Sequence, residues 1–134
     1  MDLSFGTELN DFRSELRTFL GEHWSPNSNA GESRQERAKR FLKVAIEHGY
    51  AYRNVPRRYG GSEQPPDALR AEIIREEFSR VRAPLESKGP GVSLLVPTLL
   101  EWGTEWQKEK FVAPTLLGDI IWCQGYSEPG AGSD

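Results

Sequence analysis

The sequence predicts a mainly α-helical fold, with a helical bundle over residues 1–118 and a single strand and loop over residues 119–134. Two observations predict the bundle: apolar residues recur at three- and four-residue steps, and short Pro- and Gly-rich stretches separate these segments. A third observation predicts the strand, because β-branched and aromatic residues replace the helical period from Asp119 to Tyr126.

The first expected helix covers residues 4–24. Ser4 or Thr7 can cap its beginning, and Gly21, followed by a cluster of Pro, Asn and Ser, marks its end. One apolar stripe runs along this helix, which predicts the face that it buries. The stripe consists of Leu9, Phe12, Leu16, Phe19 and Leu20.

The second expected helix covers residues 32–48. Ser33 followed by Glu36 fits a capping box, and Gly49 fits a left-handed stop. Its expected buried residues are Ala38, Phe41, Leu42, Ala45 and Ile46. Basic residues mixed with glutamates at helical spacing predict a solvent-exposed face with ion pairs. These basic residues are Arg34, Arg37, Lys39, Arg40 and Lys43.

A long Pro- and Gly-rich loop with a turn at Gly60-Gly61 precedes the third expected helix. This helix begins at about residues 65–67, where proline is tolerated in the first turn, and it ends before Pro84. The residues expected to point inward are Leu69, Ile73, Ile74 and Phe78.

Residues 92–103 are apolar on almost all sides, which predicts a central, buried helix. Pro97 inside this segment must either kink the helix or begin a new turn. Thr104 and Gln107 fit a second capping box, so a fifth short helix follows and stops around residues 114–118.

Composition excludes several classes of protein. The net charge of −3 disfavours nucleic acid as the main partner. No apolar run approaches the ~20 residues that a membrane span needs, and the N-terminus lacks the pattern of a secretory signal. Cys123 is the single cysteine, so no internal disulfide forms, and no residue spacing fits a metal site. We therefore expect a cytoplasmic protein.

The chain ends in IIWCQGYSEPGAGSD, an apolar stretch that runs into a glycine-rich loop. Alternation along the expected strand places Trp122, Gln124 and Tyr126 on one face, which suits a flat, amphipathic ligand such as a flavin ring. Gly130 and Gly132 allow the backbone to approach such a ligand closely. A plain strand-to-turn connection and a dinucleotide-binding turn are the alternatives, between which a lone Gly-x-Gly does not discriminate.

Several motifs, in order and spacing, resemble the acyl-CoA dehydrogenase family. SEPGAGSD after an apolar strand resembles the family's flavin-binding signature. FRSELRTFLGEHW is similar to its first helix, AIEHGYAYRNVPRRYGGS to its Pro-x-x-Tyr-Gly-Gly segment, and LLEWGTEWQKEKFVAPTLLGD to its Gly-Thr-x-x-Gln-Lys helix. The resemblance implies an N-terminal all-α domain at residues 1–118. Residues 119–134 then correspond to the first strand and flavin-binding loop of a truncated middle β domain, because a lone strand cannot pair its backbone groups.

The resemblance implies part of a flavin-dependent enzyme that binds FAD and dehydrogenates acyl-CoA thioesters between their α and β carbons. In the family, the position of Ser127 contacts the flavin edge, and that of Ser133 lies near the cofactor phosphates and the acyl-CoA. The implied cofactor-binding residues are Gln124, Gly125, Tyr126, Ser127, Gly132 and Ser133. The implied substrate-binding residues are Ser133, Leu95 and Leu99, although each leucine also fits an ordinary core position.

The family's catalytic glutamate lies in a C-terminal domain, so the resemblance assigns no catalytic residue to this chain, which is expected to be inactive alone. His23 and His48 are expected at helix ends as surface or capping residues. The resemblance implies electron-transfer flavoprotein as the electron acceptor and a homo- or hetero-oligomer, mostly a tetramer. Two alternatives stay open: an acyl-CoA oxidase on the same scaffold, or a non-catalytic homologous subunit or fragment that serves as an interaction module.

Overall fold

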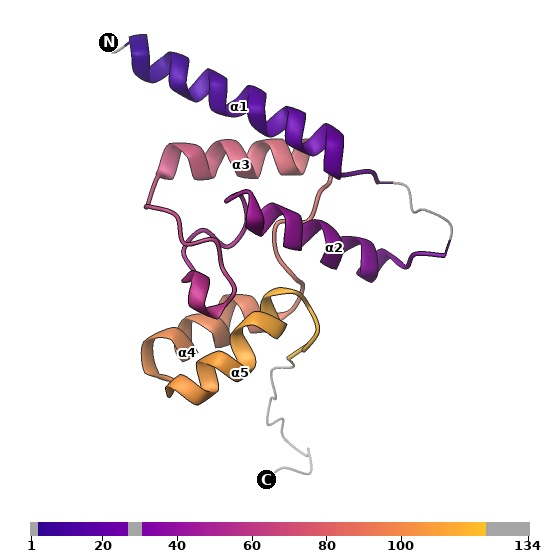
Figure 1. Cartoon of the computed structure of the whole chain (residues 1–134), viewed down its shortest axis with the longest axis vertical. Coiled ribbons are helices and arrows are strands. Elements are labelled where there is room, and N and C mark those ends of the chain that lie inside the picture. The colour runs from indigo at the N-terminus through magenta and orange to yellow at the C-terminus, as the bar shows by residue number, and fades with distance from the viewer. Residues whose placement is uncertain (1–2, 27–30, 123–134) are drawn as a thin grey trace, which may run out of the picture.

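A computed structural model describes residues 3–26 and 31–122, and these residues form helices joined by loops (Figure 1). The predicted helical fold is confirmed. The α-helices are α1 (Leu3–His23), α2 (Arg34–Glu47), α3 (Ala68–Arg80), α4 (Val96–Trp102) and α5 (Glu105–Leu116). Two short helices accompany them: the 3-10 helix η1 (Arg57–Tyr59) and the π-helical turn η2 (Gly91–Leu95).

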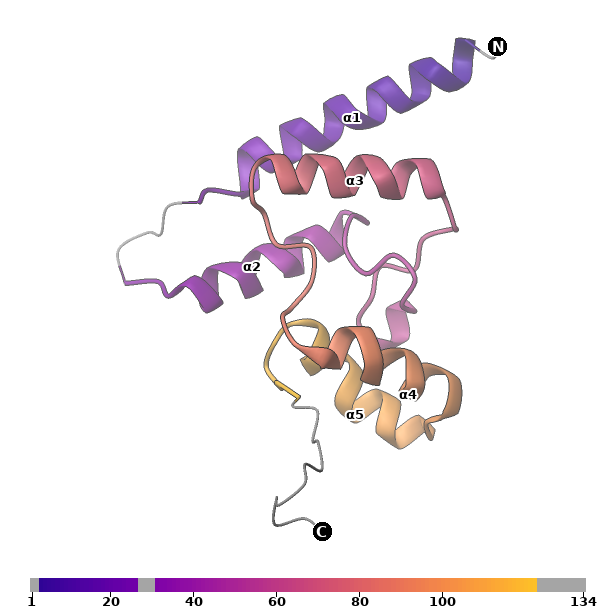
Figure 2. The same cartoon turned by 180° about the vertical axis from the view of Figure 1, so that it is seen from behind.

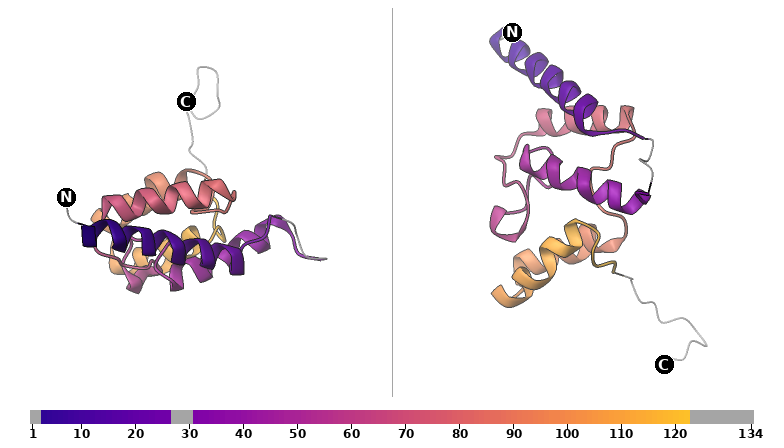
Figure 3. Two further views of the ribbon diagram at one scale, coloured as in Figure 1. Left: turned by 90° about the horizontal axis from the view of Figure 1, so that it is seen from above. Right: turned by 45° about the vertical axis from the view of Figure 1, so that its right-hand side comes forward.

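The helices are arranged in two groups. Helices α1, α2 and α3 gather at one end of the molecule, with α3 beside α1, and the pair α4 and α5 lies at the other end (Figures 1 and 2). The loop between α2 and α3, which contains η1, and the segment after α3 connect the two groups (Figure 3). The grooves described below lie along these connections.

The core of the first group is aromatic. Phe41 of α2 contacts Phe19 of α1 at 5.8 Å and Phe78 of α3 at 5.7 Å between ring centroids. All three side chains are buried, as the apolar stripes predict. The expected inward position of Leu69 is wrong: this residue is half exposed, because it lies in the first turn of α3, at the end of the stripe.

Both predicted capping boxes are present. The amide of Glu36 donates to Ser33 Oγ at 3.1 Å, and the amide of Gln107 donates to Thr104 Oγ1 at 3.2 Å. In each box the long side chain accepts from the backbone of the cap residue. Gly49 has a φ of 81°, so the predicted left-handed stop of α2 is confirmed.

The capping and end residues expected for α1 are wrong, whereas the turn at Pro97 and the end of α5 agree with expectation. Helix α1 begins at Leu3, so Ser4 and Thr7 lie inside it and do not cap it, and Gly21 is also helical. Pro97 lies at the first turn of α4, directly after η2, so it begins a new helix as one of the two expected outcomes. Pro114 lies inside α5, which continues to Leu116.

The expected strand is absent from the part of it that the structure describes. Asp119 and Ile120 form a bend after α5, and Ile121 and Trp122 have no regular structure. A strand needs a neighbour to pair its backbone groups, and residues 119–122 have none among the described residues. Residues 123–126, the rest of the expected strand, lie outside the described residues.

The basic face of α2 is not uniformly exposed, contrary to expectation. Arg37 is only 8% exposed, and its guanidinium carbon lies 5.4 Å from the centre of the Trp24 ring. Arg40 pairs with Glu32 at 2.8 Å, and Lys39 pairs with Asp119 at 2.6 Å. Tertiary packing against Trp24 therefore removes one arginine from the solvent-exposed face that helical spacing predicts.

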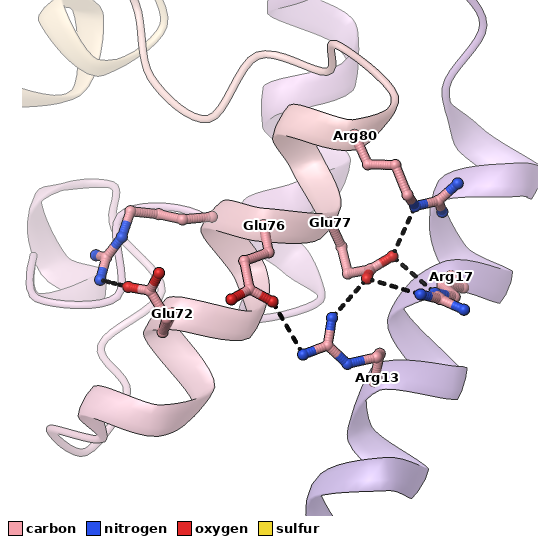
Figure 4. Close-up of polar contacts among 7 residues, drawn as sticks. Arg13, Arg17, Glu72, Glu76, Glu77 and Arg80 are labelled. Carbon is pink, nitrogen blue, oxygen red and sulfur yellow. Dashed lines mark hydrogen bonds and ion pairs between the residues drawn. The ribbon is translucent and has the colours of Figure 1, made fainter.

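An ion cluster joins α1 to α3 (Figure 4). Glu77 of α3, whose side chain is 2% exposed, accepts hydrogen bonds from Arg13 at 2.7 Å, Arg17 at 2.8 Å and Arg80 at 3.0 Å. These bonds, that of Arg17 foremost, outweigh the opposing effect of burial and lower the pKa of Glu77 from 4.5 to about 2. The cluster fixes α1 on α3 at a point where a lone buried carboxylate would be strongly unfavourable.

Two kinds of feature are absent from the described residues. None of their helices has the length and hydropathy that crossing a membrane requires. Within the same part of the chain, no group of three or more His, Cys, Asp or Glu side chains has a metal-binding arrangement.

Candidate functional site

A groove of about 720 Å³ lies between the α2–α3 loop, α3 and the segment formed by η2 and α4. We call it the apolar groove, because buried aliphatic side chains form much of its lining. These include Val55, Ile74, Val96 and Leu116, together with the half-buried Val92 and Leu100. Charged side chains, among them Arg53 and Asp67, also line it. Mostly apolar walls with a few polar groups are typical of small-molecule sites.

The α2–α3 loop is rigidly held where it borders the apolar groove. Ser62, which is fully buried, donates from its backbone to the Tyr52 carbonyl at 3.0 Å and from Oγ to the Ala51 carbonyl at 2.8 Å. Gly61 lies so close to Val55 that a Cβ there would be 2.2 Å from the Val55 carbonyl oxygen. Only glycine fits this approach, so the loop keeps one wall of the groove in place.

Tyr52 connects this loop to both neighbouring segments. Its hydroxyl donates to the Leu116 carbonyl at the end of α5 (2.5 Å) and accepts from the Ser87 amide (2.8 Å). Tyr52 has a φ of 49°, a left-handed conformation that is uncommon outside glycine. Burial raises the pKa of its hydroxyl. The buried hydroxyl therefore holds the base of the apolar groove together.

The segment that leads to the glycine-rich loop is anchored at Trp122. Its indole donates to Thr115 Oγ1 at 2.8 Å, and its ring meets Phe111 edge-on at 5.7 Å between centroids. Trp122 also packs on Gly91, where a Cβ would lie 2.7 Å from both the indole Cδ1 and Thr115 Cγ2. The chain therefore leaves the helical domain beside the first residue of η2, next to the wall of the apolar groove that η2 supplies.

The structure places two of the sequence-predicted site residues. Leu95 and Leu99 are half-buried, and Leu99 packs against the core. The lining of the apolar groove includes Val92, Val96 and Leu100 of the same segment but neither Leu95 nor Leu99. The other predicted residues, Gln124, Gly125, Tyr126, Ser127, Gly132 and Ser133, lie outside the described residues, as does Cys123.

The two histidines lie at helix ends, as expected. His23 is the last residue of α1, and His48 caps the end of α2, with its Nδ1 at 2.9 Å from the Val44 carbonyl. Both rings pack against Phe19, at 4.9 and 4.8 Å between centroids. They lie on the α1–α2 surface and do not line the apolar groove.

The sequence pattern does not single out Tyr52, Ser87 or Thr115, because a polar residue in a loop or near a helix end is common. Among the residues of these contacts, Gly91 is the one that the sequence pattern could have indicated. It follows Gly89-Pro90 and precedes an apolar run, and a glycine in such a place indicates close approach of another segment.

The acyl-CoA dehydrogenase N-terminal domain matches residues 6–119. The chain belongs to the acyl-CoA dehydrogenase family. The match covers all the helices described above apart from the first residues of α1. The resemblance proposed from the motifs is thus confirmed.

Similar curated proteins include acyl-CoA dehydrogenases from bacteria and mammals. Acyl-CoA dehydrogenase IpdE1 of Mycolicibacterium smegmatis is 32% identical over 136 residues, covering 95% of this chain and 34% of the relative. Acyl-CoA dehydrogenase FadE34 of Mycobacterium tuberculosis is 60% identical over 82 residues, covering 59% of this chain and 10% of the relative. The long-chain specific mitochondrial acyl-CoA dehydrogenase of Mus musculus is 31% identical over 134 residues, covering 97% of this chain and 30% of the relative.

The chain spans about a third of the length of the first of these relatives and less of the other two. No solved structure matches it significantly.

Proposed function

We propose that this chain is the N-terminal helical part of a flavin-dependent acyl-CoA dehydrogenase that acts on acyl-CoA thioesters. The observation that carries the proposal is the family match over residues 6–119, directly ahead of the segment SEPGAGSD. The names of the relatives agree, because each describes an acyl-CoA dehydrogenase. On this proposal the catalytic glutamate belongs to a part of the enzyme outside these 134 residues.

The proposed cofactor is FAD, which would be bound by the glycine-rich segment from Gln124 to Ser133. Bound there, FAD would supply the acceptor for a hydride from the β carbon, and a base elsewhere in the enzyme would remove the α proton. The described structure bears on this assignment at Trp122, whose bond to Thr115 fixes where the segment leaves the helical domain. Gly91 makes room for that indole, so Trp122, two residues before Gln124, lies beside the η2 wall of the apolar groove.

The apolar groove is the proposed wall for the acyl chain. Val92, Val96 and Leu100 present aliphatic surface along η2 and α4, which suits an alkyl chain. Leu95 and Leu99, proposed from the resemblance, lie on the same segment outside this lining. Electron-transfer flavoprotein as acceptor, an oligomer in the full enzyme and a cytoplasmic location complete the proposal.

A chimera tests the proposed function. This chain would replace the matching third of the Mycolicibacterium smegmatis relative, which is 32% identical to it. We expect the purified chimera to retain FAD and to reduce a dye acceptor when an acyl-CoA is added. A folded, flavin-containing chimera that shows no acyl-CoA-dependent reduction would favour the non-catalytic subunit, and reduction of oxygen in place of the dye would favour the oxidase.

The same chimera separates the two serines of the signature. Ser127→Ala should weaken FAD binding by up to roughly tenfold, the effect of one lost hydrogen bond. Ser133→Ala should instead raise the KM for acyl-CoA more than it lowers kcat, as expected when ground-state and transition-state binding are lost equally. The reverse pattern, with Ser133→Ala stripping the flavin, would contradict this division.

Bulky substitutions test the acyl wall. Leu100→Trp should fill part of the apolar groove and lower kcat/KM for long acyl chains more than for short ones. Leu95→Trp is the matched control from the same segment, since Leu95 lies outside the lining. If Leu95→Trp changes the chain-length preference more than Leu100→Trp does, the acyl chain is bound at Leu95 and Leu99, as the resemblance implies, and not in the apolar groove.

A further inference from the structure

A second groove also borders α3. It encloses about 1040 Å³ between the ends of α1 and α3, the first turns of α2 and the segment that follows α3. In Figures 1 and 2 that segment descends past α2 toward η2 and α4. We call it the basic groove, because its lining includes Arg34, Arg37, Arg82 and Lys88. The proposed enzyme makes no use of these residues.

Five arginine and lysine residues line the basic groove, and three of them have exposed side chains and no carboxylate partner among the described residues. Arg34, Arg82 and Lys88 make no ion pair there, although the chain as a whole carries a net charge of −3. The two glutamates that also line the basic groove are already bound: Glu72 by Arg75 at 2.5 Å and Glu76 by Arg13 at 3.0 Å. The groove therefore presents uncompensated positive charge.

Arg37 supplies an independent observation. It is 8% exposed, and its Nε is buried without a hydrogen-bond partner among the described residues. Its guanidinium lies over the Trp24 ring, which orients the planar group without neutralising it. Glu32, the acidic residue whose pKa Arg37 also lowers, is itself bound by Arg40 at 2.8 and 3.0 Å. A buried arginine without a carboxylate is costly unless an anion compensates its charge.

We propose that the basic groove binds a small phosphate-bearing anion. A guanidinium presents its N–H groups as a planar fork that matches phosphate oxygens, and Arg37 holds this fork in a fixed orientation. Arg34, Arg82 and Lys88 line the same groove from two different segments, and several cations in one groove favour an anion with more than one phosphate group. A diphosphate fits this arrangement, either as a free anion or as the diphosphate of a nucleotide.

Calorimetric titration of the 134-residue chain with inorganic pyrophosphate at low ionic strength tests the proposal. We expect saturable binding that Arg34→Ala and Lys88→Ala each weaken by about tenfold, the effect of one charge-assisted hydrogen bond. Lys43→Ala is the matched control, since it removes an exposed, unpaired cation of the same helix that lies outside the groove. This control should leave the affinity unchanged.

Arg37→Met removes the buried charge while keeping an unbranched side chain, and it should abolish binding. Circular dichroism of each variant establishes that the helices are intact. A parallel titration with ADP distinguishes a free diphosphate from a nucleotide as the ligand. If ADP and pyrophosphate bind with equal affinity, the groove recognises the diphosphate alone, and if ADP binds more tightly, the groove recognises a nucleotide. The proposal is overturned if neither pyrophosphate nor ADP binds saturably. It is also overturned if Lys43→Ala loses as much affinity as the groove variants, because the attraction would then come from the overall charge of the chain and not from the groove.

Discussion

Replacing Glu77 by glutamine tests the physical account of the α1–α3 cluster. The substitution preserves the size of the side chain and removes its charge, so Arg13, Arg17 and Arg80 lose their common partner. A pKa lowered from 4.5 to about 2 corresponds to roughly 3 kcal/mol of folding stability. Because the arginine side chains are 33–54% exposed, solvent screening reduces the expected loss at pH 7 to about 2 kcal/mol.

The pH dependence gives this prediction its sign. The folded-state pKa lies below the unfolded value, so the stability that Glu77 contributes is fully present above pH 4.5. It is lost as the pH falls from 4.5 toward 2, because the carboxylate must then be protonated. Other carboxylates with lowered pKa values, such as Glu32 and Asp67, also contribute to acid sensitivity. The difference between the wild type and Glu77→Gln therefore isolates the effect of Glu77.

Urea unfolding followed by circular dichroism at a series of pH values measures this difference. At pH 7 the midpoint of Glu77→Gln should be about 1 M lower, and the two unfolding curves should converge as the pH approaches 2. Glu76→Gln is the matched control: Glu76 is the preceding residue, its side chain is half exposed, and Arg13 is its one ion-pair partner within the part of the chain that the structure describes. It should change stability by less than about 0.5 kcal/mol. The reasoning would be refuted if Glu76→Gln and Glu77→Gln had equal effects on stability. It would also be refuted if the stability difference between the wild type and Glu77→Gln did not change with pH.

Three further variants test the packing of the fold by urea unfolding. Gly61→Ala should destabilise the chain by about 3 kcal/mol or more, because its Cβ would lie 2.2 Å from the Val55 carbonyl oxygen. Gly21→Ala is the control: a Cβ at this position of α1 meets no other atom, so this variant should stabilise the chain by about 0.5–1 kcal/mol. If Gly61→Ala leaves the urea midpoint unchanged, the backbone of Gly61 does not approach Val55 as closely as the structure shows. Arg37→Met should leave stability unchanged or raise it, since it removes a buried charge without a carboxylate partner; a loss above about 2 kcal/mol would show that the contact with Trp24 dominates.

Features that depend on neighbours in sequence were predictable. The capping boxes at Ser33 and Thr104 and the left-handed Gly49 depend on hydrogen bonds and sterics within a few residues. The apolar stripes of α1 and α2 were equally plain, because burial on one face imposes a helical period. Phe41 lies at the centre of the core for this reason.

Features that depend on packing between distant segments were not predictable. Glu77 and Arg37 have the spacing of surface residues, and only the position of α1 or Trp24 explains why they are buried. The sequence also did not predict which side of the η2–α4 segment lines the apolar groove. This segment is apolar on almost all sides, so its pattern does not indicate one buried face. The structure selects the positions four residues apart, Val92, Val96 and Leu100, and leaves Leu95 and Leu99 outside the groove.

The hydroxyl of Tyr52 has a consequence for the order of folding. Its two partners, Ser87 and Leu116, are 35 and 64 residues away along the chain, so both bonds form only after long loops have closed. Helices stabilised by local caps can form earlier, at little entropic cost. The junction at Tyr52 therefore belongs to the late part of the folding reaction, and weakening it should speed unfolding much more than it slows folding. The wall of the apolar groove thus acquires its final shape only when the two helical groups join.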